Sequence, residues 1–293
     1  MFCVVTIQGV PMKIYISLAL SLFFFISLFI FAYVVPLTPP SASAFQHHSI
    51  GSNNNFITDE LLLRYYSTNS QISSQAKHQI AKTALADLNY SHWGEFANSI
   101  KIHIYKEQIL PSNSKQLIVA LNLSKDLAVI AVFEKKRNNY VLHSKIENLV
   151  PIKDIHFYTY PSRNYKFMSI TQMLDERLGA FSFEEFLEIY FLQNESFEKV
   201  WRKPLYSEEI FKEVWIEPEA SENVWNKIVE KTLVDIVSNE SITINTFSSL
   251  SKYIAYNENF PSDIDFKLVG SSVSKQSYKW NNQQQSFLMI SDI

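Results

Sequence analysis

Histidine is the first residue type to consider for chemistry, because imidazole binds metal ions and transfers protons near neutral pH. His92 and His103 flank Glu95, and zinc takes ligands of these types. The HExxH and His-x-Glu spacings that would place ligands together are absent, and His47 and His48 are adjacent residues in a polar stretch. We therefore expect solvated or hydrogen-bonded histidines and no metal site. The histidines with no recognisable nucleophile nearby are His103, His143 and His156.

Neighbouring carboxylates are the second candidate, because two of them can act as general acid and base in hydrolysis. Such pairs occur at Asp175-Glu176 and at Glu184-Glu185. Asp175 and Glu176 stand in the loop-like "DERLG", where Arg177 can pair locally. Successive side chains of a strand point to opposite faces, so Glu184 and Glu185 cannot share a site on a strand. We predict no catalytic residue.

Tryptophan is the third candidate, because its ring offers a stacking surface for a sugar or a peptide. The chain is 14% aromatic and has only five glycines, so most of its large rings are expected to form the core. Any functional aromatic patch is a subset that the sequence does not identify. The five tryptophans are Trp93, Trp201, Trp215, Trp225 and Trp280.

Composition excludes several classes of function. The scarcity of glycine excludes phosphate-binding loops of the P-loop or GxGxxG kind, and "GSS" at Gly270 lacks the G-x-S-x-G form of a serine hydrolase. The only cysteine is Cys3, so the rest of the chain has no disulfide and no thiolate nucleophile. With 26 basic and 29 acidic residues there is no basic excess for nucleic acid. We expect no cofactor and no nucleic-acid partner.

The N-terminal region predicts a membrane segment at residues 14–35, which carry no charge and are long enough to cross a bilayer. Tyr15 and Tyr33 stand near its ends, where aromatic rings favour the headgroup region. Lys13 precedes the segment, and the next basic residue is Arg64. By the positive-inside rule, residues 1–13 are cytoplasmic and the remainder lies outside. We expect a single-pass protein with its N-terminus inside and its C-terminus outside.

The sequence is compatible with two interpretations of this segment. It is an uncleaved anchor, or a signal peptide removed after the small-x-small sequence that ends at Ala44, in which case the protein is secreted. The apolar run is longer than an ordinary signal-peptide core. Residues 1–11 carry no charge, so translation is expected to start at Met12. Both readings export the chain from Phe45 onward.

The exported part divides into a polar linker at residues 36–59, a helical segment at 60–98 and a β-rich domain at 99–293. Within the helical segment, Ala81, Ala84, Leu85 and Leu88 have helical spacing behind a Ser cap at position 73 or 74. We therefore predict an amphipathic helix there.

Two β-meanders are predicted next. "IKIHIYKEQIL" alternates apolar and polar residues, and "QLIVALNL", "LAVIAVFEK" and "YVLHSKIENL" follow with a turn at "KRNN". "KFMSITQM", "FLEIYFL" and "FEKVWRKPL" repeat this pattern around "NES". Phe133 and Tyr140 bracket the first turn, and Tyr190 and Phe197 bracket the second at an offset of 57 residues. A third, weaker match to this pattern is the pair Trp280 and Phe287.

Some segments are ambiguous. Residues 182–193 fit a helix by their capping-box spacing and a strand by the repeat, and we favour the strand. Residues 207–215 are predicted to form a short helix, and residues 221–237 place six apolar or small residues on one helical stripe. The remainder to the C-terminus returns to strands.

The strand, tight loop, strand, turn, strand order of "KQLIVALNLSKDLAVIAVFEKKRNNYVL" resembles the blades of FG-GAP and VCBS repeats over residues 100–205. This resemblance implies an extracellular binding scaffold. The calcium loop of those families has the form D-x-D-x-D-G, whereas this chain has "LPSNSK" and no carboxylate there. An open sheet, a sandwich and a partial propeller all remain compatible with the pattern.

The sequence thus predicts a β-rich α+β protein, held in the membrane through residues 14–35, with two or three helices outside the membrane. The expected function is non-catalytic binding at the cell envelope, with a protein or a glycan as partner. The alternative is a cell-envelope hydrolase that uses a carboxylate pair.

Overall fold

The computed structural model describes residues 56–160, 165–178 and 181–292. They belong to one compact unit, Asn54–Ile293. The predicted membrane segment at 14–35, the cleavage position after Ala44 and most of the predicted linker lie outside the described residues. Within the described ranges, no helix combines the length and apolarity that a membrane span requires.

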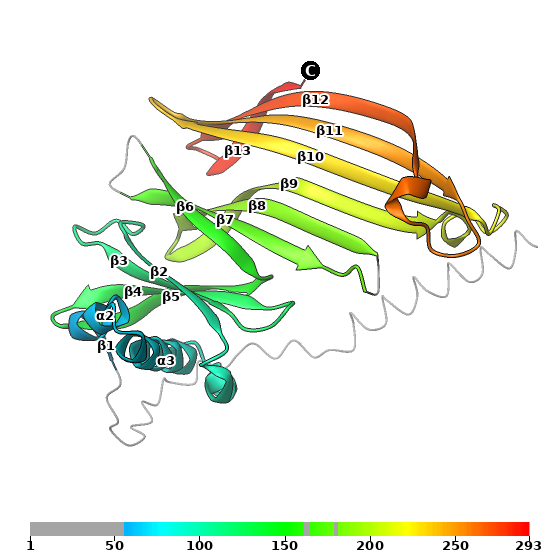
Figure 1. The fold of residues 1–293 in the computed structure, drawn as a ribbon. Coiled ribbons are helices and arrows are strands. Elements are labelled where there is room, and N and C mark those ends of the chain that lie inside the picture. The colour runs from blue at the N-terminus through cyan, green and yellow to red at the C-terminus, as the bar shows by residue number, and fades with distance from the viewer. Residues whose placement is uncertain (1–55, 161–164, 179–180, 293) are drawn as a thin grey trace, which may run out of the picture. The chain divides into compact units, whose positions relative to one another are not determined.

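Two antiparallel sheets make up most of this unit, which confirms the β-rich prediction (Figure 1). Sheet A has five strands in the order β1-β5-β4-β3-β2, and sheet B has eight in the order β13 to β6. The strands of sheet A are β1 (Ile57–Thr58), β2 (Lys101–Glu107), β3 (Gln116–Asn122), β4 (Ala128–Lys136) and β5 (Asn139–Leu149). Those of sheet B are β6 (Ile152–Thr159), β7 (Lys166–Asp175), β8 (Ser182–Gln193), β9 (Ser196–Lys212), β10 (Val224–Ser238), β11 (Ile242–Tyr256), β12 (Lys267–Asn281) and β13 (Ser286–Asp292).

Sheet A is buried on both faces, which explains the continuous apolar runs of β3 and β4. Leu117, Val119 and Phe133 point to the side covered by helices. Ile118 and Ile130 point to the opposite side and pack against residues of sheet B. A strand covered on both faces needs apolar side chains at every position rather than at alternate ones.

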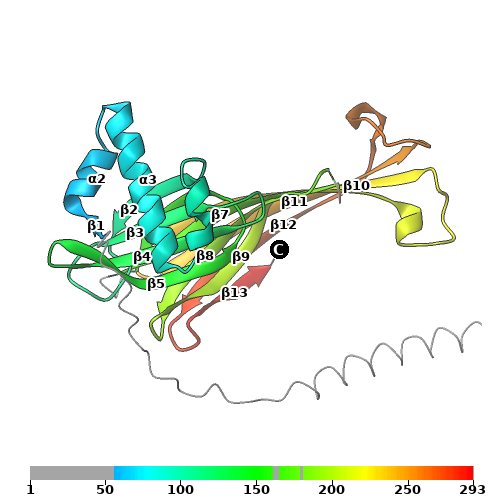
Figure 2. The same cartoon turned by 90° about the horizontal axis from the view of Figure 1, so that it is seen from below.

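Two α-helices cover the first face of sheet A, α2 (Asp59–Tyr65) and α3 (Ser70–Asp87) (Figure 2). The helix predicted behind Ser73 or Ser74 exists, but it begins earlier. The Asn69 side chain is its cap and accepts hydrogen bonds from the backbone amides of Gln71 and Ile72, at 3.0 and 3.2 Å. A short 3-10 helix, η1 (Ser91–Phe96), leads from α3 towards β2.

Sheet B curls around a core of aromatic rings. Phe167 on β7 stacks on Phe191 of β8, with ring centroids 4.3 Å apart. It also meets Trp280 of β12 at 4.7 Å, although four strands separate β7 from β12 in the sheet order. Strands so far apart can touch only if the sheet bends towards itself. The same core contains Trp201 and Phe287.

Both helices predicted after residue 206 are wrong. Residues 207–212 continue β9 and pair with β10, and only Glu213–Trp215 form a short 3-10 helix, η2. Residues 224–238 are β10, whose fifteen residues include seven Val, Ile or Thr. These β-branched residues favour strands, and pairing with β9 and β11 on both sides outweighs the helical spacing.

The predicted meanders are confirmed as β3–β5 and β7–β9, and residues 182–193 are a strand, as favoured. Asn194 and Glu195 both have positive φ angles, 47° and 70°, as the tight turn of a two-residue β-hairpin requires. Trp280 and Phe287 pair directly across the β12–β13 hairpin. Each of the three aromatic pairs recognised in the sequence therefore brackets the turn of a β-hairpin.

The Asp59 side chain links α2 to sheet A, and the strength of this link is expected to depend on pH. Its carboxylate accepts hydrogen bonds from Lys135, from the Tyr140 hydroxyl at 2.9 Å and from Lys106 at 3.2 Å. The bonds from Lys135 and Tyr140 hold the pKa of Asp59 at about 2, below its ordinary value of 3.8. The stabilisation is therefore complete above pH 4 and is lost as the pH falls towards 2.

We expect Asp59→Asn to lower the free energy of unfolding at pH 6 by about 1 kcal/mol or less, since the pair is partly exposed. Urea unfolding at pH 6, 4 and 2.5 measures this, and the difference from the wild type should shrink at the lowest pH. Glu60→Gln changes a neighbouring exposed carboxylate and is the control. A difference that is constant with pH would contradict the role of the Asp59 carboxylate.

Candidate functional site

The predicted carboxylate pairs are separated in the structure. Glu184 and Glu185 point to opposite faces of β8, and each has its own cation. Arg202 contacts both carboxylate oxygens of Glu184 at 2.7 and 2.8 Å, and Lys153 contacts both of Glu185 at 2.8 and 2.7 Å. Neither carboxylate therefore faces a free partner carboxylate with which to carry out acid–base catalysis.

Asp175 is held by the loop that follows it, as the sequence indicates. The Arg177 guanidinium donates to both carboxylate oxygens, at 2.9 and 2.5 Å, and lowers the pKa of Asp175 to about 2. A carboxyl group with so low a pKa is ionised at neutral pH and cannot act there as a general acid. The local ion pair of Asp175 is thus with Arg177, as the sequence indicates, and gives no support to a catalytic Asp175-Glu176 pair.

Glu188 is a buried carboxylate that the sequence does not single out. Its side chain on β8 accepts hydrogen bonds from Gln172 of β7 at 2.8 Å, from the Tyr190 hydroxyl at 2.7 Å and from Lys199 at 2.8 Å. Arg202 approaches the same carboxylate at 3.6 Å. Gln172 in turn accepts a hydrogen bond from the backbone amide of Val150, which lies in the connection between β5 of sheet A and β6 of sheet B. Every side chain of this network has a partner, which is typical of a structural element.

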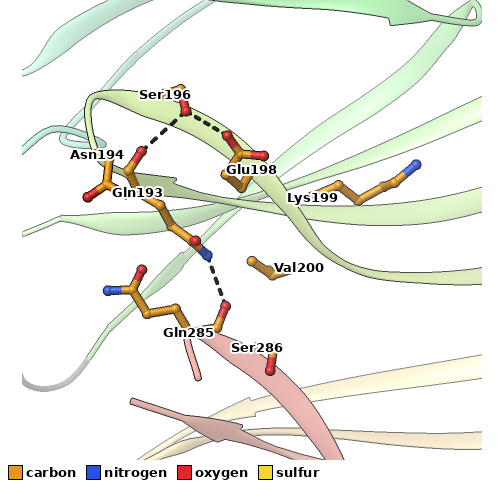
Figure 3. Close-up of a pocket in the computed structure, with 8 residues that line it drawn as sticks. All are labelled: Gln193, Asn194, Ser196, Glu198, Lys199, Val200, Gln285 and Ser286. Carbon is orange, nitrogen blue, oxygen red and sulfur yellow. Dashed lines mark hydrogen bonds between the residues drawn. The ribbon is translucent and has the colours of Figure 1, made fainter. Parts of the chain in front are cut away.

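Figure 3 shows a pocket where the turn between β8 and β9 approaches the turn between β12 and β13. Its volume is about 440 Å³ and it is widely open to solvent. The Gln193 side chain donates to the Gln285 carbonyl at 2.9 Å and joins the two turns. The lining residues are Gln193, Asn194, Ser196, Glu198, Lys199, Val200, Gln285 and Ser286.

The charged groups of this pocket are already engaged. Glu198 accepts a hydrogen bond from the Ser196 hydroxyl at 2.6 Å. The Lys199 side chain points away from the other lining residues in Figure 3, and its ammonium group binds Glu188. The pocket therefore presents amide and hydroxyl groups beside one exposed carboxylate, that of Glu198, and it lacks the apolar lining that small-molecule sites usually have.

The histidines form no metal centre among the described residues, where no three His, Cys, Asp or Glu side chains gather closely enough. His103 on β2 is partly buried, and burial is the main cause that lowers its pKa. Its Nε2 atom has no hydrogen-bond partner in the described part. His156 contacts Asp154 at 3.0 Å. His47 and His48 lie outside the described residues.

The tryptophans separate into core and surface. Trp201 and Trp280 belong to the core of sheet B, and Trp93 is partly buried beside α3. Trp225 is buried near the start of β10, whereas Trp215 is 56% exposed. Only Trp215 and its surroundings therefore fit the predicted aromatic surface.

Four rings gather where the β9–β10 and β11–β12 connections meet, and we call them the tip cluster: Phe181, Trp215, Trp225 and Phe260. Phe181 lies 4.8 Å from Phe260 and is nearly parallel to Trp215 at 6.3 Å between centroids. Trp225 meets Trp215 at 5.6 Å and Phe260 at 5.3 Å. The two connections thus share one aromatic surface.

The backbone holds the tip cluster in place. The Trp225 indole donates to the Asn257 carbonyl at 3.0 Å, which joins the start of β10 to the second connection. Asp265 accepts hydrogen bonds from the Ser262 amide and hydroxyl at 2.8 and 2.7 Å and closes a capping box around η3 (Asp263–Asp265). Loops fixed in this way lose little conformational entropy when they bind a partner.

Phe181 has a φ angle of 52°, a conformation that a bulky side chain rarely adopts. Such strain costs on the order of 1–3 kcal/mol and is found mostly at functional sites. Here it places the ring against Trp215 and Phe260 while the Phe181 carbonyl accepts from the Ile210 amide at 3.1 Å. The strained residue is thus part of the tip cluster.

A second accessible surface is the free edge of sheet B. In the described residues, β13 pairs with Gln276–Asn281 of β12, whereas residues 267–275 pair with β11 alone. Leu268, Val269 and Val273 in this stretch are exposed. An unpaired strand edge can accept a further strand from another chain.

Comparison with known proteins finds no match: no family model, no curated protein and no solved structure is significantly similar to this chain. The resemblance to FG-GAP and VCBS blades stays a prediction.

Proposed function

We propose that this chain is a non-catalytic domain, anchored in the membrane through residues 14–35, that binds a partner at the cell envelope with its tip cluster. The observation that carries the proposal is the exposure of large aromatic side chains on loops that are fixed in position. Trp215 is 56% and Phe260 is 49% exposed. Exposed apolar patches of this kind are typical of binding surfaces, and tryptophan is enriched among the residues that dominate binding energy.

The alternative, an envelope hydrolase, gains no support from the described carboxylates. Glu184, Glu185 and Asp175 are ion-paired, and Glu188 is buried in a completed network. A hydrolase would need two carboxyl groups facing a substrate cleft. The geometry favours a binding role.

Crosslinking in intact cells tests the proposal. A photoreactive amino acid is placed at position 215 of the full chain, or at position 66 as the control, because Tyr66 is 59% exposed in the helical layer. We expect a crosslinked partner from position 215 and none from position 66. The same adduct from both positions, or none from position 215, would contradict the assignment. Protease added to these cells should digest a C-terminal tag if the domain faces outward, and a protected tag would refute the topology.

Trp215→Ser is expected to weaken partner binding by about 2 kcal/mol, roughly 30-fold, as for a central aromatic contact. The matched variant is Tyr66→Ser, which removes an equally exposed ring elsewhere. The yield of the crosslink, formed from a probe at the neighbouring position 216, measures the effect. Equal yields from the two variants would show that the ring of Trp215 does not contribute.

A further inference from the structure

We propose that the partner of the tip cluster is a basic protein segment that carries an apolar anchor residue. This inference rests on the proposed binding function and specifies its ligand. It follows from the charges that surround the exposed rings.

The two connections that form the tip are strongly acidic. Residues 213–223 and 257–266 contain seven carboxylates and no lysine or arginine. By contrast, the whole chain is nearly balanced, with 26 basic and 29 acidic residues. The acidic residues are Glu213, Glu217, Glu219, Glu222, Glu258, Asp263 and Asp265.

Most of these carboxylates have no partner in the part of the chain that the structure describes. Asp263 binds Lys227 at 2.9 Å, and Asp265 is used by the capping box. The five glutamates make no side-chain hydrogen bond or ion pair with any described residue. Their negative charge is therefore available to a partner.

The lysines that adjoin the two connections offset only part of this charge. The Lys212 ammonium lies over the ring of Trp225 at 5.1 Å. Lys227 is 13% exposed and is held between Glu208 and Asp263, at 2.9 Å from each. Both cations are thus engaged within the fold. Lys267, which directly follows the second connection, is exposed and has no ion pair among the described residues, so it offsets one of the five free glutamates, and the two connections keep a net negative charge.

The apolar side chains define the other half of the ligand. Trp215 and Phe260 are flanked by Ile216 and Ile264, which are 66% and 91% exposed. An apolar anchor would cover these side chains, and an arginine could also stack on the indole face. The surrounding glutamates would attract the cationic residues beside that anchor and raise the rate of encounter.

This charge pattern separates the ligand classes. Anionic lipid surfaces and nucleic acid would be repelled by the glutamates. A neutral glycan could stack on Trp215 but would make no use of the charge. A basic polypeptide segment uses both features, so we infer that class.

Selection from a random 12-residue peptide library displayed on phage, against the full chain in detergent, tests the inference. We expect the enriched peptides to be net positive and to contain an aromatic or aliphatic residue. A synthetic copy of the leading peptide is then titrated against the variants by fluorescence polarisation. Its affinity should fall roughly tenfold between 50 and 500 mM NaCl, because exposed charges are screened. Enrichment of neutral or acidic peptides would overturn the inference.

The variants distinguish the two proposals. The double variant Glu217→Lys with Glu219→Lys should weaken binding of this peptide at least roughly tenfold. The control, Glu60→Lys with Glu95→Lys, makes an equal charge change at exposed positions of the helical layer. It should change the binding affinity by less than about twofold. If Trp215→Ser weakens binding and the Glu217 and Glu219 reversal does not, the charge inference fails alone. If neither variant has an effect, the tip is not the binding surface. Salt-independent binding of a neutral N-acetylglucosamine hexasaccharide, lost in Trp215→Ser, would assign the tip to a glycan instead.

Discussion

Replacing Phe167 with alanine is expected to lower the free energy of unfolding by about 3–5 kcal/mol, the usual cost of truncating a buried phenylalanine. The side chain is 1% exposed and lies among rings from β8, β12 and β13. Its removal would leave a cavity between strands that the curl of sheet B brings together. Surrounding rings of this size cannot collapse into such a space without leaving their own packing.

Equilibrium unfolding in urea, followed by tryptophan fluorescence, measures the change. Trp280 lies 4.7 Å from Phe167 and reports on the same core. Phe247→Ala is the matched control, because Phe247 is 49% exposed on β11 of the same sheet and should cost less than about 1 kcal/mol. Equal effects of the two substitutions would refute the packing that makes sheet B curl.

Replacing Glu188 with alanine is expected to cost about 2–4 kcal/mol, because it leaves buried hydrogen-bond donors without an acceptor. The Tyr190 hydroxyl and the Gln172 amide both donate to this carboxylate, and both residues are buried. Lys199 would also lose its partner, but its side chain is half exposed and can turn to water. The loss therefore falls mainly on the two buried donors.

Glu184→Ala provides the comparison from the same strand. Glu184 is paired with Arg202 at a partly exposed position, so its removal should cost less than about 1 kcal/mol. Glu188→Gln keeps one acceptor oxygen and should fall between the two. Thermal and urea unfolding of the three variants measure the order. A smaller effect for Glu188→Ala than for Glu184→Ala would contradict the assigned role of the network.

The early strands could be predicted because their sequence pattern and their environment agree. β3 and β4 are continuous apolar runs bounded by polar turns, and they lie between the helices and sheet B. The hairpin between β8 and β9 could be recognised from the aromatic spacing it shares with the β4–β5 hairpin. Helix α3 could be predicted from its apolar spacing. Its start at Ser70 could not, because the capping residue Asn69 lies before the first of the apolar positions.

The later strands could not be predicted from periodicity. In β10, Trp225, Val229 and Leu233 point to one face, and Ile228 and Ile236 point to the other. Because both faces of β10 carry apolar residues, the spacing of these residues along the sequence resembles that of an amphipathic helix. Pairing with β9 and β11 decides the conformation, and pairing partners far along the chain do not appear in a local window.

The sequence by itself determined the composition limits, the β-rich class and the expectation that neighbouring carboxylates on a strand would not share a site. It also offered the five tryptophans as candidates for an aromatic surface, without indicating which of them are exposed. Only the tertiary structure decided which rings form that surface. Trp215 and Phe260 are exposed on two separate connections and pack against Phe181 and the buried Trp225. Trp201 and Trp280, equally apolar in sequence, are buried by the curl of sheet B. Burial depends on which strands meet in space, and that is a property of the folded sheet rather than of any one segment.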